Sequence, residues 1–143
     1  MKLASLPQNM ADFEGKWVLD RQIADARAGQ NGHLTGHAVF TRRSESVLEY
    51  CEEGRLQMGQ GPALQATRRY IWHFDAGQVA VQFDDEAPFH RFALTPTAVG
   101  EDHLCGDDLY RSTYDFADWP KWECRWSVVG PRKDYVSTTR YRR

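Results

Sequence analysis

The sequence predicts an all-β protein that folds as a single domain over residues 1–143. Apolar and polar residues alternate with a period of two along most of the chain, as expected for strands with one buried face. Clusters of Gly, Pro, Asp and Asn interrupt this alternation about every ten residues. Aromatic residues make up 13% of the chain and include five Trp, and aromatic side chains favour strands. Together these patterns indicate a many-stranded sandwich or barrel.

The expected elements follow from where the alternation begins and ends. No stretch has a sustained helical period, and the one helix expected is short, over residues 5–12. Turns are expected where Gly and Pro cluster, at residues 28–32, 59–62, 75–77, 84–86 and 130–131. For residues 96–105 the sequence leaves open a fully paired strand or a lid. The expected strands are 14–23, 33–42, 47–57, 65–75, 78–84, 88–95, 98–105, 109–116, 122–129 and 134–142.

Each strand is assigned because it carries one apolar face that can point toward a core. The side chains expected to face inward include, in chain order, Trp17, Leu19, Leu34, Ala38, Phe40, Leu48, Tyr50, Tyr70, Trp72, Phe74, Val79, Val81, Phe83, Phe92, Leu94, Trp122, Trp126, Val128, Thr139 and Tyr141. Four charged or titratable residues share these faces: Arg21, Glu52, Arg68 and His90. Burying an unpaired charge costs several kcal/mol. We therefore expect these groups to be paired, hydrated or used to bind a ligand.

Composition excludes several functional classes. The net charge is −2 and the pI is near 6.2, which argues against a nucleic-acid-binding domain. The first fifteen residues contain no apolar run, so neither a secretory signal nor a membrane span is expected, and a cytoplasmic location follows. Three cysteines without a CxxC spacing fit free thiols in a reducing compartment, with Cys51 and Cys124 expected to be buried. No cofactor is predicted.

The two ends of the chain resemble the signature of calycins, the barrel group of lipocalins and fatty-acid-binding proteins. Gly15-Lys16-Trp17 opens the first strand, and a basic, aromatic stretch closes the last. The resemblance implies a closed antiparallel barrel of about nine or ten strands with a short N-terminal helix. It also implies that Trp17 packs against a basic side chain near the C-terminus, supplied by Arg140, Arg143 or Lys133.

A wider set of motifs resembles an uncharacterised bacterial family of calycin-like barrels. Fatty-acid-binding proteins hold a carboxylate with an Arg-x-Tyr pair on the last strand, where this chain has the reverse order, Tyr141-x-Arg143. Fatty-acid specificity is therefore not expected. The motifs of the wider set are Phe13-x-Gly15-x-Trp17-x-Leu19-x-Arg21, Arg68-x-Tyr70-x-Trp72, Phe89-His90, His103-x-Cys105-Gly106-x-Asp108-x-Tyr110 and residues 130–135.

Because such a barrel encloses a cavity, the resemblance implies that the chain binds a small molecule. Arg21 and Arg68, with Glu52 beside them, could hold a carboxylate or phosphate through paired donors, so an anionic or aromatic ligand is predicted. The alternative is an internal Arg–Glu pair without a ligand. The predicted ligand-binding residues are Arg21, Tyr50, Glu52, Arg68, Tyr70, Trp72, His90, Tyr110, Trp126 and Tyr141.

Two other functions remain open. One is a small isomerase or hydrolase that uses His90 as acid or base, with Glu52 or Asp108 as its partner. The other is a non-catalytic interaction module with a filled core, in which an exposed Trp119 and the barrel rim form a homodimer. No metal site is predicted, because the spacing after His103 matches no known zinc motif and favours a turn.

Overall fold

The computed structural model describes residues 6–143, and its single helix is shorter than expected. Helix α1 spans Met10–Phe13, and residues 6–8 before it have no regular secondary structure. The start of the expected helix at residue 5 lies outside the described residues. The Asp12 carboxylate accepts hydrogen bonds from the backbone N–H groups of Gln8 and Asn9, at 2.8 and 3.2 Å. These bonds hold the chain ahead of the helix, and Gly15, with a φ of +108°, turns it into the first strand.

Eleven strands follow in the described part of the chain. They are β1 (Gly15–Asp25), β2 (Gln30–Arg42), β3 (Val47–Met58), β4 (Leu64–Asp75), β5 (Gln78–Phe83), β6 (Pro88–Ala93), β7 (Thr97–Val99), β8 (His103–Cys105), β9 (Asp108–Asp115), β10 (Trp122–Gly130) and β11 (Lys133–Arg142). The prediction of one strand over residues 98–105 is wrong in one respect, because this part of the chain forms two short strands, β7 and β8. At the break, Gly100 N–H donates to Ser112 on β9, whereas Glu101 N–H donates to Arg91 on β6, so the backbone changes partner.

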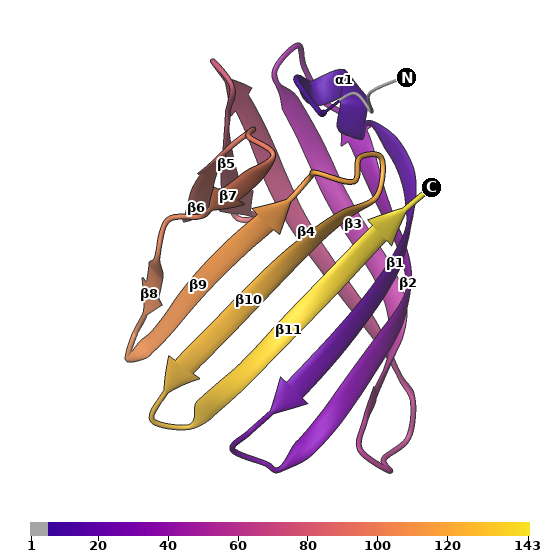
Figure 1. Cartoon of the computed structure of the whole chain (residues 1–143), viewed down its shortest axis with the longest axis vertical. Coiled ribbons are helices and arrows are strands. Elements are labelled where there is room, and N and C mark those ends of the chain that lie inside the picture. Colours follow the sequence, from indigo (N-terminus) through magenta and orange to yellow (C-terminus); the bar gives the residue numbers. More distant parts are fainter. Residues whose placement is uncertain (1–5) are drawn as a thin grey trace.

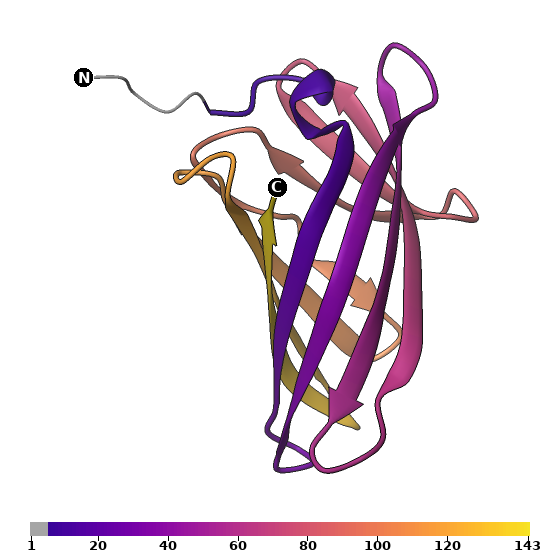
Figure 2. The same cartoon turned by 90° about the vertical axis from the view of Figure 1, so that its right-hand side faces the viewer.

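All strands belong to one antiparallel sheet that curves into a nearly closed barrel (Figures 1 and 2). The order is β6-β5-β4-β3-β2-β1-β11-β10-β9-β7, and β8 also pairs with β9. The first and last strands of the chain, β1 and β11, are therefore neighbours. The edges β6 and β7 form no ladder with each other, and the backbone bond from Glu101 N–H to the Arg91 carbonyl, 2.9 Å long, spans the seam. The expectation of a fully closed barrel is corrected, because the ladders of the sheet end at β6 and β7, and within residues 6–143 a single backbone bond, not a ladder, joins the two sides of the seam.

The end of the barrel beneath α1 is filled by aromatic side chains. The Phe13 ring is fully buried and lies 5.0–5.9 Å, centroid to centroid, from six other rings. These rings belong to Phe40, Trp72, Phe74, Phe116, Trp119 and Trp122. The expectation of an exposed Trp119 is wrong, because its ring is half-buried against Phe13 and Trp17. The side chain that suggested a homodimer is thus part of the chain's own core.

Trp17 and Arg143 tie the two ends of the chain together at the same end. Arg143 places its guanidinium 3.9 Å from the Trp17 ring centroid, and Nη2 donates to the carbonyls of Asp12 and Glu14 at 2.7 and 3.2 Å. The Trp17 indole N–H donates to the Phe13 carbonyl at 2.9 Å. The expected cation–π contact is confirmed with Arg143 as its cation. It anchors α1 to β1 and to the end of β11.

The cysteines are free thiols in three different environments. Cys124 is buried, Cys51 is half-buried on the outward face of β3, and Cys105 is exposed. The expectation that Cys51 is buried is therefore only partly correct. Among residues 6–143 no helix has the length and apolar character needed to cross a membrane.

Replacing Arg143 by Ala should lower the free energy of unfolding by about 1–3 kcal/mol, because the cation–π contact and the bonds to two carbonyls are lost. Urea denaturation followed by Trp fluorescence measures this change. Arg142→Ala is the matched control, since Arg142 is exposed and forms no ion pair within residues 6–143, and its effect should stay within about 0.5 kcal/mol. Equal effects of the two substitutions would contradict the role of Arg143.

Candidate ligand-binding site

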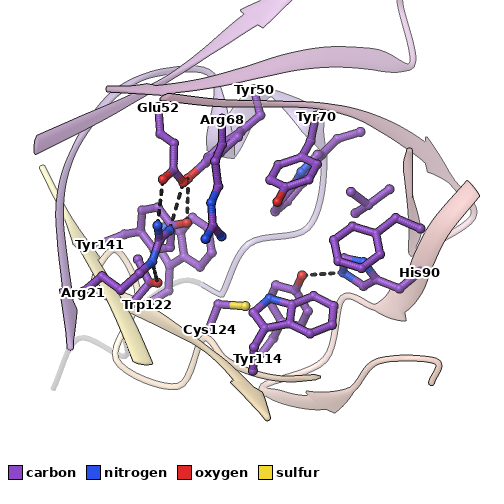
Figure 3. A pocket seen from close by; sticks show the side chains of 15 residues that line it. Arg21, Tyr50, Glu52, Arg68, Tyr70, His90, Tyr114, Trp122, Cys124 and Tyr141 are labelled. Atoms are coloured by element: carbon purple, nitrogen blue, oxygen red, sulfur yellow. Dashed lines mark hydrogen bonds and ion pairs between the residues drawn. The ribbon is translucent and has the colours of Figure 1, made fainter. Parts of the chain in front are cut away.

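Two adjoining compartments lie between the aromatic cluster and the end of the barrel opposite α1. The inner compartment has a volume of about 40 Å³, and Figure 3 shows the side chains around it. The second, here called the mouth compartment, has a volume of about 280 Å³. Its lining residues are Arg68, Tyr70, Phe83, Phe89, His103, Cys105, Tyr110, Trp126, Val128, Tyr135 and Ser137. Arg68, Tyr70, Phe89 and Trp126 line both compartments.

A buried ion pair forms one wall of the inner compartment. Arg21 on β1 donates from Nη1 and Nη2 to the two carboxylate oxygens of Glu52 on β3, at 2.7 and 2.9 Å, and from Nε to Thr139 on β11 at 2.7 Å (Figure 3). Burial alone would raise the pKa of Glu52, but the hydrogen bonds and charge of Arg21 outweigh it and the pKa is lowered. Arg21 and Glu52 therefore form the internal Arg–Glu pair that the sequence offered as an alternative. The Arg21 guanidinium already donates hydrogen bonds to Glu52 and Thr139.

Two tyrosines extend this network across the barrel. The Tyr50 hydroxyl donates to Glu52 Oε1 at 2.6 Å and lies 2.8 Å from the Tyr141 hydroxyl. Burial raises the pKa of both phenols, so both stay protonated. Tyr141 also stacks on Trp122 at 3.8 Å between ring centroids. These contacts fix the hydroxyls of β3 and β11 in place and link the ion pair to the aromatic cluster.

Arg68 has a different environment from Arg21. It lies on β4 directly opposite Glu52 in the β3–β4 register, and its side chain is exposed. Figure 3 shows it extending toward the middle of the cavity, between the ion pair and Tyr70. Within residues 6–143 no carboxylate forms an ion pair with Arg68. It therefore presents a cation at the boundary of the two compartments.

The mouth compartment has aromatic walls that the sequence reasoning largely missed. Phe89 stacks between Phe83 and Trp126, with centroids 4.5 and 4.8 Å away and interplanar angles of 19° and 11°. The His103 ring meets Phe89 edge-on at 5.1 Å. Strict alternation assigned only one of Phe89 and His90 to the interior. A register shift between β5 and β6 brings both neighbours to the cavity. In the sequence, the position of Phe89 and His90 directly after Pro88 could have indicated this irregularity.

Within residues 6–143 His90 forms no hydrogen bond or ion pair with a carboxylate. It is buried, and its Nε2 lies 2.6 Å from the Tyr114 hydroxyl. Burial, with a smaller effect from His103, lowers the pKa of His90 to about 3. The predicted pairing with Glu52 or Asp108 is wrong, because Glu52 is bound by Arg21 and Tyr50 and Asp108 pairs with Lys133 at 3.2 Å. This arrangement gives no support to acid–base chemistry at His90.

The predicted ligand-binding residues come together in space. Nine of the ten line the inner compartment, and Tyr110 lines the mouth compartment. Their role in binding stays a prediction. The residues missed by the sequence reasoning lie mainly at the mouth: Phe83, Phe89, His103, Cys105, Val128, Tyr135 and Ser137. Among residues 6–143 no three His, Cys, Asp or Glu side chains are grouped so that they could hold a metal ion.

The model of DUF6314, a family of unknown function, matches residues 13–143 of the chain. Because this match covers most of the sequence, the chain belongs to that family. A search of the curated proteins gives no match.

Two solved structures have a similar barrel. A protein of unknown function from the DUF3598 family of Nostoc punctiforme has 10% identity and a TM-score of 0.60 over 92% of this chain and 46% of its own. The S-type phycobiliprotein lyase CPES from Guillardia theta has the same identity and TM-score over 92% of this chain and 86% of its own. The chain thus spans about half the length of the DUF3598 protein. At this identity the similarity shows the fold alone.

The burial of His90 should make the protein less stable in mild acid. Its pKa is about 3 in the folded state, against 6.5 ordinarily, so between these values only the unfolded chain binds the proton. Stability contributed by His90 is present above pH 6.5 and is lost as the pH falls toward 3. From pH 7 to 5 we expect a loss of about 2 kcal/mol, measured by urea denaturation.

His90→Gln should remove most of this pH dependence. His37→Gln should keep it, because His37 is exposed on the outer face of β2. An unchanged pH dependence in His90→Gln would show that other groups cause the loss.

Proposed function

We propose that this DUF6314 protein reversibly binds a small anionic or aromatic molecule in the mouth compartment, with Arg68 contacting it. The observation that carries the proposal is the exposed guanidinium of Arg68, which forms no ion pair within residues 6–143 and lines an aromatic cavity of about 280 Å³. A guanidinium can hold a carboxylate or phosphate through two parallel hydrogen bonds. A ligand acid would supply the counter-charge that Arg68 lacks.

The neighbouring groups favour binding at Arg68 over binding at Arg21. Arg21 already uses Nε, Nη1 and Nη2 in bonds to Thr139 and Glu52, so a ligand acid would have to displace a buried carboxylate. Arg68 requires no such exchange. The rings of Phe89 and Trp126 beside it provide apolar contact area for an aromatic body. The predicted residues Tyr70 and Tyr110 also line the mouth compartment. The hydrogen-bonded network of Arg21, Tyr50, Glu52 and Tyr141 lines the inner compartment next to it.

We also propose that the protein works in a reducing compartment such as the cytoplasm. The support is the set of three free cysteines, one of them exposed. An exposed thiol is more easily oxidised outside such a compartment.

A thermal-shift screen of aromatic acids, fatty acids and organic phosphates tests the binding proposal. At least one class should raise Tm, and in Arg68→Ala the affinity should fall at least about tenfold, because a charge-assisted bond is lost. Arg69→Ala is the matched control: Arg69 is the next residue on β4, points outward and pairs with Glu49 at 3.5 Å. A hit that binds equally well to Arg68→Ala would refute the site.

Ligand binding should also protect Cys105 from alkylation. Cys105 lines the mouth compartment and is exposed, so an occupied mouth should slow its reaction with iodoacetamide severalfold. Mass spectrometry of Cys51→Ser protein with and without the screen hit measures this rate, because buried Cys124 then contributes little. An unchanged rate at saturating ligand would place the ligand outside the mouth.

A further inference from the structure

We infer that the ligand is a flat aromatic monoanion of one or two rings, bound with its acid group against Arg68 and its rings in the mouth compartment. The inference rests on the proposed function and adds the charge, size and orientation of the ligand. Three features of the two compartments carry it: their net charge, the small volume behind Arg68, and the aromatic walls in front of it.

The charge of the compartments matches a single negative charge. Of the side chains that line them, Arg21 and Arg68 are cations and Glu52 is an anion, which leaves 2 − 1 = one positive charge. Arg21 and Glu52 neutralise each other through the bidentate contact. One ligand anion would neutralise Arg68 in the same way. A second ligand charge would lie in the mouth compartment, where Arg68 is the one cation among the described side chains that line it, and would therefore have no cation of its own to pair with.

The volume behind Arg68 fixes the orientation. The inner compartment of about 40 Å³ is far smaller than the roughly 150 Å³ cavity that encloses benzene, although it could hold a water molecule or a carboxylate oxygen. Beyond it lie the closely packed rings of Phe40, Trp72 and Trp122. Neither a ring nor a long alkyl chain can pass in this direction. The acid group must therefore point inward and the body of the ligand outward.

The mouth compartment limits the size and shape of that body. Its volume of about 280 Å³ is roughly twice that of a benzene-sized cavity, which suits one or two rings. Phe89 stacks on Trp126 at 11°, whereas His103 meets Phe89 and Tyr110 meets Trp126 edge-on, at 81° and 72°, so the wall contains rings in both of the orientations in which aromatic groups pair. A flexible chain would also lose more conformational entropy there than a rigid ring system.

Isothermal titration calorimetry at pH 8 with four probes tests the inference. The probes are 2-naphthoate, the dianion 2,6-naphthalenedicarboxylate, the neutral 2-naphthamide, and undecanoate, which has the same carbon count as 2-naphthoate. We expect 2-naphthoate to bind at least tenfold more tightly than each of the others. Equal or tighter binding of any other probe would overturn the inference and leave the proposed function standing. Binding of none of the four also overturns the inference, and the proposed function fails with it only if the broader screen finds no ligand.

Two variants then test whether charge causes the discrimination. Glu52→Gln removes the anion of the pair, and His103→Lys adds a cation at the mouth without touching the pair. Each substitution should reduce the ratio of the affinity for 2-naphthoate to the affinity for 2,6-naphthalenedicarboxylate at least fivefold. His103→Gln removes the same ring without adding a charge; it should weaken the binding of both probes alike and leave the ratio of their affinities within about twofold of that of the original protein. If Glu52→Gln fails to fold, His103→Lys decides, and an unchanged preference in the folded variants would refute the charge argument.

Discussion

The buried contact between Arg21 and Glu52 is the constraint on which the rest of the interior depends. It joins β1 to β3 across the intervening β2, and the bond from Arg21 to Thr139 includes β11. Each charge would be costly to bury alone, so the pair can exist only with both partners in place. Because the Glu52 carboxylate is bound by Arg21 and Tyr50, its neighbour Arg68 forms no ion pair with it or with another carboxylate of residues 6–143. The exposed guanidinium at the mouth is thus a consequence of pairing deeper inside.

The barrel has two halves with different roles. In the half beneath α1, the rings around Phe13 fill the interior and hold the termini through Trp17 and Arg143. In the other half the inward side chains of the same strands line the two compartments. The interior changes from apolar to polar at Tyr141. Its ring stacks on Trp122 in the aromatic cluster, and its hydroxyl contacts Tyr50 in the polar network. Rigid packing in one half can therefore position the polar groups of the other.

The sequence predicted features that depend on alternation and local composition. The long strands and the inward direction of Arg21 and Glu52 follow from such patterns, whereas the contact between Trp17 and a basic residue near the C-terminus follows from the resemblance to calycins. It failed at Phe89, where a register shift brings consecutive residues to the cavity, and at residues 98–105, where the backbone changes partner. It also could not assign partners to charges. Glu52 lies opposite Arg68 in the register of β3 and β4, yet its carboxylate is bound by Arg21 from β1, and neither alternation nor strand register predicts that choice.

The seam of the barrel lies between β6 and β7, which follow one another in the sequence. These two edge strands fail to pair, whereas the first and the last strand, β1 and β11, are paired neighbours. The strands therefore form a ring whose gap coincides with one short connection, residues 94–96. A rearranged chain in which β11 leads into α1 and β1, and which is opened at residues 94–96, would keep every ladder of the sheet. The seam is thus the place where the chain can be opened without breaking a strand pair of the sheet.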